Sequence, residues 1–136
     1  MVLVHHDTPV PPPASPMRRW LWKFACALRG VLVGMQGQNS FYVHVPAAIV
    51  VCIVAAWLEV SLAEWLVLVL CITVVMTAEL LNSALEHLAR AVTREVHPEV
   101  RNALDIASGA VLVASLGACV VGVMVLVNHW APVVGS

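Results

Sequence analysis

Three polar residues of the types that bind metals and move protons lie inside a hydrophobic segment: Glu79, Asn82 and Glu86. We call them the polar triplet. Their spacings of three and four residues place all three side chains on one face of an α-helix, over about two turns. Carboxylates at the end of a membrane helix are costly, and they commonly mark functional sites. Because two carboxylates and an amide can bind a metal ion and accept a proton, the triplet predicts a metal and proton-transfer site.

The triplet also has a structural interpretation, as a set of polar contacts between membrane helices, each worth about 0.6 kcal/mol. Two acids on adjacent turns make poor contacts of this kind, because like charges repel. Arg90, however, lies four residues after Glu86 and is placed to pair with it on a helix. The residues alone leave both interpretations open.

Two further residues near the start of the last apolar segment have a functional and a structural interpretation each. Asp105 is either a carboxylate favoured by the dipole at the start of a helix or a hydrogen-bond acceptor for a ligand. His97 precedes Pro98, which favours a fixed turn with the proline early in the helical segment. His97 is therefore a structural residue of that turn, a ligand contact, or neither.

The composition of the chain defines the environment of these residues. The sequence has 136 residues, of which 61% are hydrophobic and 11% are charged, with a mean hydropathy of +0.92. Soluble domains are about half apolar and about one quarter charged. We therefore expect an all-α integral membrane protein of one domain. The net charge of −1 gives no support for nucleic-acid binding, and the sequence contains neither common phosphate-binding glycine motif.

Three apolar segments are expected to be transmembrane helices, at about 39–58, 65–91 and 99–128. Each is long enough to cross a hydrocarbon core of about 30 Å, the second only if its polar end lies at the interface. Three helices enclose too little interior to shield two carboxylates from lipid. We therefore expect a homo-oligomer, in which the polar triplet faces a neighbouring subunit or a cleft open to the cytosol.

The N-terminal part of the chain has two sections of different composition. Residues 1–16 are rich in proline and are expected to be a disordered tail. Residues 17–37 combine basic and aromatic side chains, a pattern typical of an amphipathic helix in the membrane interface. An unusually basic start to a transmembrane helix remains the alternative for this second section.

The distribution of basic residues predicts the orientation in the membrane. All of them lie in the N-terminal segment or in and beside the link between the second and third apolar segments: Arg18, Arg19, Lys23, Arg29, Arg90, Arg94 and Arg101. Because positive charge stays in the cytosol, the N-terminus is expected inside and the C-terminus outside. The polar triplet then lies at the cytosolic end of its helix.

Three stretches of the sequence resemble the small prokaryotic diacylglycerol kinase and undecaprenol kinase family. AELLNSALE, residues 78–86, is similar to the family motif E-x-x-N-[ST]-x-x-E, which is specific. KFACALRG, residues 23–30, resembles the family segment F-x-x-A-x-x-G. EVHPEVRNALDIASGAV, residues 95–111, resembles a third conserved segment, and the resemblance extends from about Arg19 to Trp130.

This resemblance implies a fold, a reaction and a location. It implies a homotrimer of three-span subunits in the bacterial cytoplasmic membrane, each with an N-terminal amphipathic helix. It also implies transfer of the ATP γ-phosphate to a lipid hydroxyl with Mg²⁺, at the cytosolic interface. In this chain Glu79 would be the general base, Asn82 would orient it, and Glu86 would be a Mg²⁺ ligand. The positions that would contribute to the nucleotide site are Arg19, Glu95, His97 and Asp105.

Three positions depart from the family pattern. Gln38 stands where many members have a second metal-binding Glu, so it is a neutral candidate for the Mg²⁺ and nucleotide site. Leu104 and Arg90 replace a Lys and an Asp of the family. These departures leave a second class open, a membrane protein without this activity, such as a proton-coupled transporter or a degenerate kinase retained for assembly. SFYVH, residues 40–44, resembles the undecaprenol branch, while diacylglycerol remains the other candidate substrate.

Overall fold

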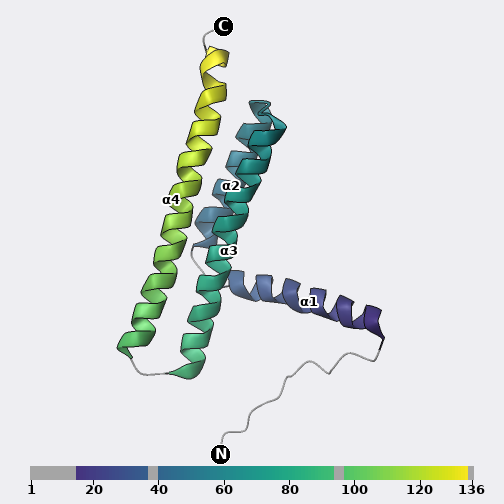
Figure 1. The fold of residues 1–136 in the computed structure, drawn as a ribbon, viewed down its shortest axis with the longest axis vertical. Coiled ribbons are helices and arrows are strands. Elements are labelled where there is room, and N and C mark those ends of the chain that lie inside the picture. Colours follow the sequence, from purple (N-terminus) through teal and green to yellow (C-terminus); the bar gives the residue numbers. More distant parts are fainter. Residues whose placement is uncertain (1–14, 37–39, 94–96, 135–136) are drawn as a thin grey trace, which may run out of the picture. The chain divides into compact units, whose positions relative to one another are not determined.

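The computed structural model describes residues 15–36, 40–93 and 97–134, and these form four α-helices without any strand (Figure 1). The helices are α1 (Pro16–Met35), α2 (Phe41–Trp57), α3 (Leu62–Val92) and α4 (Pro98–Val134). The predicted all-α class is therefore confirmed. The chain divides into two units, one that ends at Val33 and one that begins at Gly34, and each is described separately.

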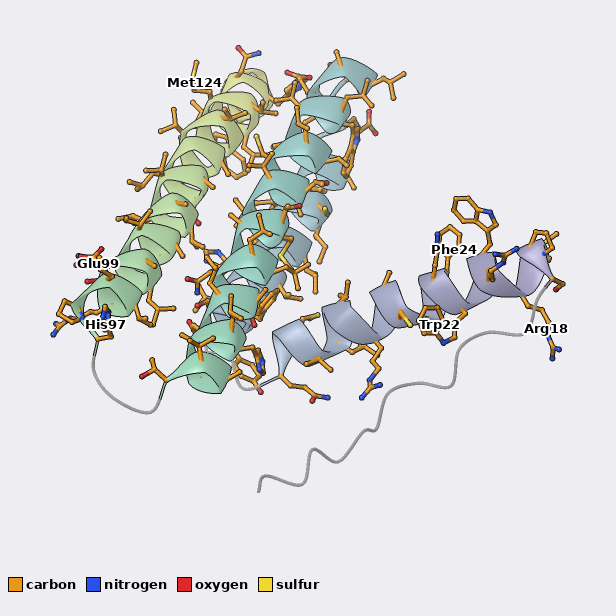
Figure 2. All side chains as sticks on the ribbon, turned by 60° about the horizontal axis from the view of Figure 1, so that its bottom comes forward. Arg18, Trp22, Phe24, His97, Glu99 and Met124 are labelled. Atoms are coloured by element: carbon orange, nitrogen blue, oxygen red, sulfur yellow. The ribbon has the colours of Figure 1, made fainter. Side chains whose placement is uncertain are left out.

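The first unit contains nearly all of α1, which begins one residue before the predicted start. The Ser15 hydroxyl accepts a hydrogen bond from the Arg18 amide at 3.4 Å, and Pro16 occupies the first helical position, where its missing N–H costs nothing. Trp22 and Phe24 point to opposite sides of the helix (Figure 2). The Lys23 ammonium lies 5.5 Å from the centre of a Trp20 ring, a cation–π contact.

The second unit contains α2, α3 and α4, and a tight turn joins the first two. The Val60 amide donates to the Ala55 carbonyl and the Glu59 amide donates to the Ala56 carbonyl, at 3.2 and 3.3 Å. This pair of hydrogen bonds is the Schellman arrangement, which requires a left-handed residue after the helix. Glu59 supplies it with a φ of 53°. The buried side chains of Ala55 and Val60 complete the turn with an apolar contact.

A capping box fixes the start of α3. The Ser61 hydroxyl accepts from the Glu64 amide, and the Glu64 carboxylate accepts from the Ser61 amide at 2.9 Å. His129 of α4 places its Nε2 2.8 Å from the same carboxylate. The helix consequently begins at Leu62, three residues before the apolar segment that we predicted from about 65.

The packed core of the second unit is small and lies near this turn. Ala55, Leu58, Val60 and Leu68 are buried together. The rings of Trp57 and Trp130 lie 5.7 Å apart. The long helices α3 and α4 run side by side and antiparallel from here to the opposite end (Figure 1).

The helices α3 and α4 are each long and apolar enough to cross a membrane, whereas α2 is a shorter apolar helix of 17 residues. Most large apolar side chains of α3 and α4 are exposed in the single chain. Since exposed apolar surface of this extent is unfavourable in water, lipid or other protein must cover it.

Candidate active site

The first residue of the polar triplet, Glu79, is among the most deeply buried side chains of the described chain, with 2% exposure. His44 of α2 places Nε2 3.0 Å from its Oε1. The direction of this contact does not satisfy hydrogen-bond geometry, and within the described residues Oε1 has no other hydrogen-bond partner. The contact with His44 is thus the one polar contact of this oxygen within the described residues.

The second residue, Asn82, is buried and connects α3 to α4. Its Nδ2 donates to Oε1 of Glu86 at 3.0 Å, and its Oδ1 accepts from the Ser108 hydroxyl at 3.5 Å. With both ends of the amide engaged, the orientation of the Asn82 side chain is defined. The network joins two of the three triplet residues, which the spacing places on one face of the helix.

The third residue, Glu86, lies closer to solvent than the other two, with a side-chain exposure of 33%. Arg90 places Nη2 3.7 Å from its Oε2, and the Arg90 Nε donates to the Glu86 carbonyl at 3.2 Å. The ion pair anticipated by the structural interpretation is therefore present. It is a surface pair of the kind worth at most about 1 kcal/mol, so it leaves Glu86 suited to a second task.

The backbone of Gly34 lies close to two side chains of α3 near Glu79, those of Leu80 and Ser83. Ser83 is 1% exposed and donates its hydroxyl to the carbonyl of Gly34 at 2.8 Å. A Cβ added at Gly34 would stand 2.8 Å from Cδ2 of Leu80. Only a glycine fits here without movement of the leucine, so the polar end of α3 is packed tightly against this position.

The remaining predicted site residues are distributed over several parts of the chain. Asp105 is exposed near the start of α4, and His97 is exposed just before it. The Nδ1 of His97 accepts from the Glu99 amide at 3.3 Å, which supports a structural role in the turn. Arg19 is exposed on α1. Gln38 and Glu95 lie outside the described residues.

His44 and Ser83 are residues of the site that the sequence interpretation did not single out. An ionisable side chain inside an apolar segment is a signal in its own right, and His44 carries it. Ser83 occupies the [ST] position of the motif E-x-x-N-[ST]-x-x-E. Its role became visible only through its contact with Gly34, 49 residues away in the chain.

The described residues contain no cluster of three or more His, Cys, Asp or Glu side chains placed to hold a metal ion. A cation that takes most of its ligands from phosphate and water does not need such a cluster, and Mg²⁺ is of this kind. The solvent-open Glu86 carboxylate has the chemistry for one such ligand. The residues present thus fit a Mg²⁺ ion delivered with a nucleotide better than a metal held by protein alone.

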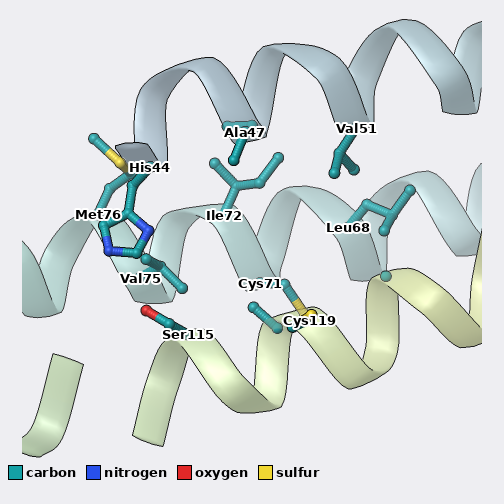
Figure 3. Close-up of a pocket in the computed structure, with 13 residues that line it drawn as sticks. His44, Ala47, Val51, Leu68, Cys71, Ile72, Val75, Met76, Ser115 and Cys119 are labelled. Atoms are coloured by element: carbon teal, nitrogen blue, oxygen red, sulfur yellow. The ribbon is translucent and has the colours of Figure 1, made fainter. Parts of the chain in front are cut away.

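An apolar pocket of about 280 Å³ extends away from His44 between α2, α3 and α4 (Figure 3). Ala47, Ile72, Val75 and Met76 are among its lining residues. The His44 ring stands at one end of it, while Glu79 is not part of the lining. The pocket has the character of a site for a hydrocarbon chain.

Comparison with known proteins relates this arrangement to a family. Residues 25–126 match the family described as prokaryotic diacylglycerol kinase. The undecaprenol kinase of Bacillus subtilis (strain 168) is 33% identical over 109 residues, which cover 80% of this chain and 89% of that protein. The diacylglycerol kinase of Pseudomonas aeruginosa is 34% identical over 98 residues, covering 72% of this chain and 80% of that protein.

A third relative, the diacylglycerol kinase of Escherichia coli (strain K12), is 28% identical over 102 residues, covering 75% of this chain and 84% of that protein. The family match covers three quarters of the chain and includes the complete polar triplet. These matches confirm the resemblance inferred from the motifs. The chain therefore belongs to the prokaryotic diacylglycerol kinase family of lipid kinases.

Proposed function

We propose that this protein transfers the γ-phosphate of ATP to the hydroxyl of a membrane lipid alcohol, with Glu79 as the general base. The observation that carries the proposal is the burial of this carboxylate beside the end of an apolar pocket, within the family motif. A carboxylate placed against a hydroxyl can accept its proton as a general base.

The proposed step needs few protein groups. Glu79 accepts the hydroxyl proton as the lipid oxygen attacks the γ-phosphorus, and ADP leaves with the electrons of the broken P–O bond. The proton then passes from Glu79 to solvent. Asn82, fixed by Ser108 and Glu86, orients the reacting groups. Positioning and charge neutralisation dominate phosphoryl transfer, so this small set of residues is chemically sufficient.

Glu86 is the proposed ligand for Mg²⁺, together with Gln38. The ion, when bound, would neutralise charge on the ATP phosphates. The proposed nucleotide contacts are Arg19, Glu95, His97 and Asp105. Exposure of Arg19, His97 and Asp105 is compatible with contacts to a soluble ligand.

Undecaprenol is the first candidate substrate and diacylglycerol the second. The undecaprenol kinase of B. subtilis shares 33% identity with this chain, and the segment SFYVH favours the same branch. Relatives named diacylglycerol kinase reach similar identity, so both lipids belong in the test.

The membrane arrangement is part of the proposal. We propose that α2 crosses the bacterial cytoplasmic membrane with α3 and α4, that α1 lies in the interface, and that three copies assemble. Extensive exposed apolar surface on α3 and α4 supports partners and lipid around each subunit. The N-terminus would be cytosolic and the C-terminus outside.

The direct test is transfer of radiolabelled γ-phosphate from Mg-ATP to each lipid by the purified protein. We expect activity with at least one lipid, loss of activity without Mg²⁺, and loss in Glu79→Gln, which removes the proton acceptor but keeps the shape. Glu59→Gln is the matched control, because Glu59 lies in the turn at the other end of α3. A trimeric wild-type protein that phosphorylates neither lipid would refute the proposal.

A further inference from the structure

We infer that His44 is a positioning residue for Glu79, which fixes one carboxylate oxygen so that the other faces the substrate. The inference rests on the proposed function, since it assigns a task only if Glu79 is the base. His44 lies on α2 and Glu79 on α3, so the contact also defines how the two helices meet at the site.

The first argument is the lack of any alternative partner. Oε1 of Glu79 is buried, and its polar neighbour is Nε2 of His44, at 3.0 Å. In the described part of the chain no Lys or Arg lies within ion-pair distance of this carboxylate; Arg90 pairs with Glu86 instead. The 3.0 Å separation is within hydrogen-bond distance, so an imidazole N–H directed at Oε1 would donate to it. Apo geometry at catalytic sites is often loose in this way.

The second argument is the rigidity of the position that carries His44. The His44 and Val43 amides both donate to the Ser40 carbonyl at 3.0 Å, so the first turn of α2 is formed. Phe41 is buried, and Pro46 restricts the backbone two residues later. A side chain held on such a turn can orient a partner that has more rotatable bonds of its own.

The third argument is the place of the imidazole relative to the pocket. His44 lines one end of the apolar pocket, whereas the Glu79 side chain does not (Figure 3). The ring therefore contacts the pocket with one part and the carboxylate with another. With Oε1 directed at His44, Oε2 is the oxygen left to take a proton from a hydroxyl presented at the pocket end.

Steady-state kinetics of His44 variants test the inference. His44→Leu removes the donor, and we expect kcat to fall about ten- to hundredfold while KM for ATP stays within about twofold. His44→Gln keeps an N–H donor at similar reach and should recover most of the loss. His44→Asn keeps the polarity but is too short, and should resemble the leucine variant. His87→Gln is the control, an exposed histidine on α3 that should retain wild-type kcat.

The pattern separates positioning from a structural role. A lower kcat in the leucine and asparagine variants, with a kcat near that of the wild type in the glutamine variant, supports the inference. If the leucine variant does not fold, the comparison of kcat between the asparagine and glutamine variants is sufficient. Equal kcat in all His44 variants, or equal loss in all three, overturns the inference while the kinase proposal stands. If the wild-type protein has no lipid kinase activity, both the inference about His44 and the kinase proposal are refuted.

Discussion

At the scale of single residues, the two carboxylates of the polar triplet differ in environment far more than their sequence positions suggest. Glu79 is 2% exposed beside a histidine, whereas Glu86 is 33% exposed beside an arginine. Pairs of acids whose surroundings differ in this way commonly divide their tasks. The buried acid suits a proton acceptor, and the solvent-open acid suits a cation that arrives with a nucleotide.

Ser83 supports this arrangement through its hydrogen bond to Gly34. Ser83→Ala leaves the Gly34 carbonyl without its 2.8 Å donor at a buried position, so we expect a loss of about 1–2 kcal/mol in the free energy of unfolding. Thermal unfolding in detergent measures the change. Thr77→Val is the control, because the Thr77 hydroxyl only returns to a carbonyl of its own helix at 2.8 Å. Equal stability of both variants would show that the Ser83 contact contributes nothing.

The sequence predicted one residue contact within α3, the pairing of Glu86 with Arg90, and it predicted that the polar triplet shares one face. The four-residue spacing that indicated the ion pair of Glu86 and Arg90 is also the spacing of Asn82 and Glu86, which are joined by a hydrogen bond. The contact between His44 and Glu79 was not predictable in this way. It depends on the position of α2 along the axis of α3. Packing between the two helices determines this position, and no local pattern in the sequence encodes it.

At the scale of elements, the end of α2 contains a residue that is poorly suited to its conformation. Glu59 adopts a φ of 53° in the Schellman turn, where a Cβ costs about 1–2 kcal/mol relative to glycine. Glu59→Gly should therefore raise the free energy of unfolding by about 0.5–1 kcal/mol, after allowance for the flexibility of glycine in the unfolded chain. The thermal midpoint in detergent is the measurement.

A matched pair of variants separates conformation from charge at this position. Glu59→Gln removes the charge and keeps the Cβ, so it should leave the midpoint unchanged. If the glutamine variant were stabilised as much as the glycine variant, charge and not backbone strain would be the cause.

Helix ends show where hydrophobic patterns stop being informative. The apolar segment from about 65 identified α3, but the helix begins at Leu62 because Ser61 and Glu64 cap it. These two polar residues are part of the helix end and not of the apolar run. The start of α1 was missed by one residue for the same reason, since Ser15 and Pro16 form its first turn.

At the scale of the whole molecule, the described chain has much less buried than exposed apolar surface. Its core cluster contains four buried residues, while large apolar side chains are exposed along every helix. Composition predicted this, because a chain that is 61% hydrophobic cannot hide its side chains in a thin bundle. Composition does not distinguish a face suited to lipid from a face suited to another subunit, because both are apolar.

The number of membrane crossings decides the orientation of the termini. At about 1.5 Å per residue the 17 residues of α2 extend about 26 Å, slightly less than a hydrocarbon core of about 30 Å. If α2 crosses, the termini lie on opposite sides; if only α3 and α4 cross, they lie on the same side. All seven basic residues lie in the N-terminal segment or around the α3–α4 link, which favours a cytosolic location for both regions.

We therefore predict three crossings, with the N-terminus in the cytosol and the C-terminus outside. A green fluorescent protein fused to the N-terminus should fluoresce, because it folds in the cytosol. Alkaline phosphatase fused after Ser136 should be active, since it requires the oxidising exterior. The same enzyme fused after Thr93, at the end of α3, is the internal control and should be inactive.

Fluorescence absent at the N-terminus, together with phosphatase activity at the C-terminus, would mean that α2 does not cross the membrane. It would also place Gly34 and the first turn of α2 away from the cytosolic end of α3, in conflict with the contacts of Ser83 and Glu79.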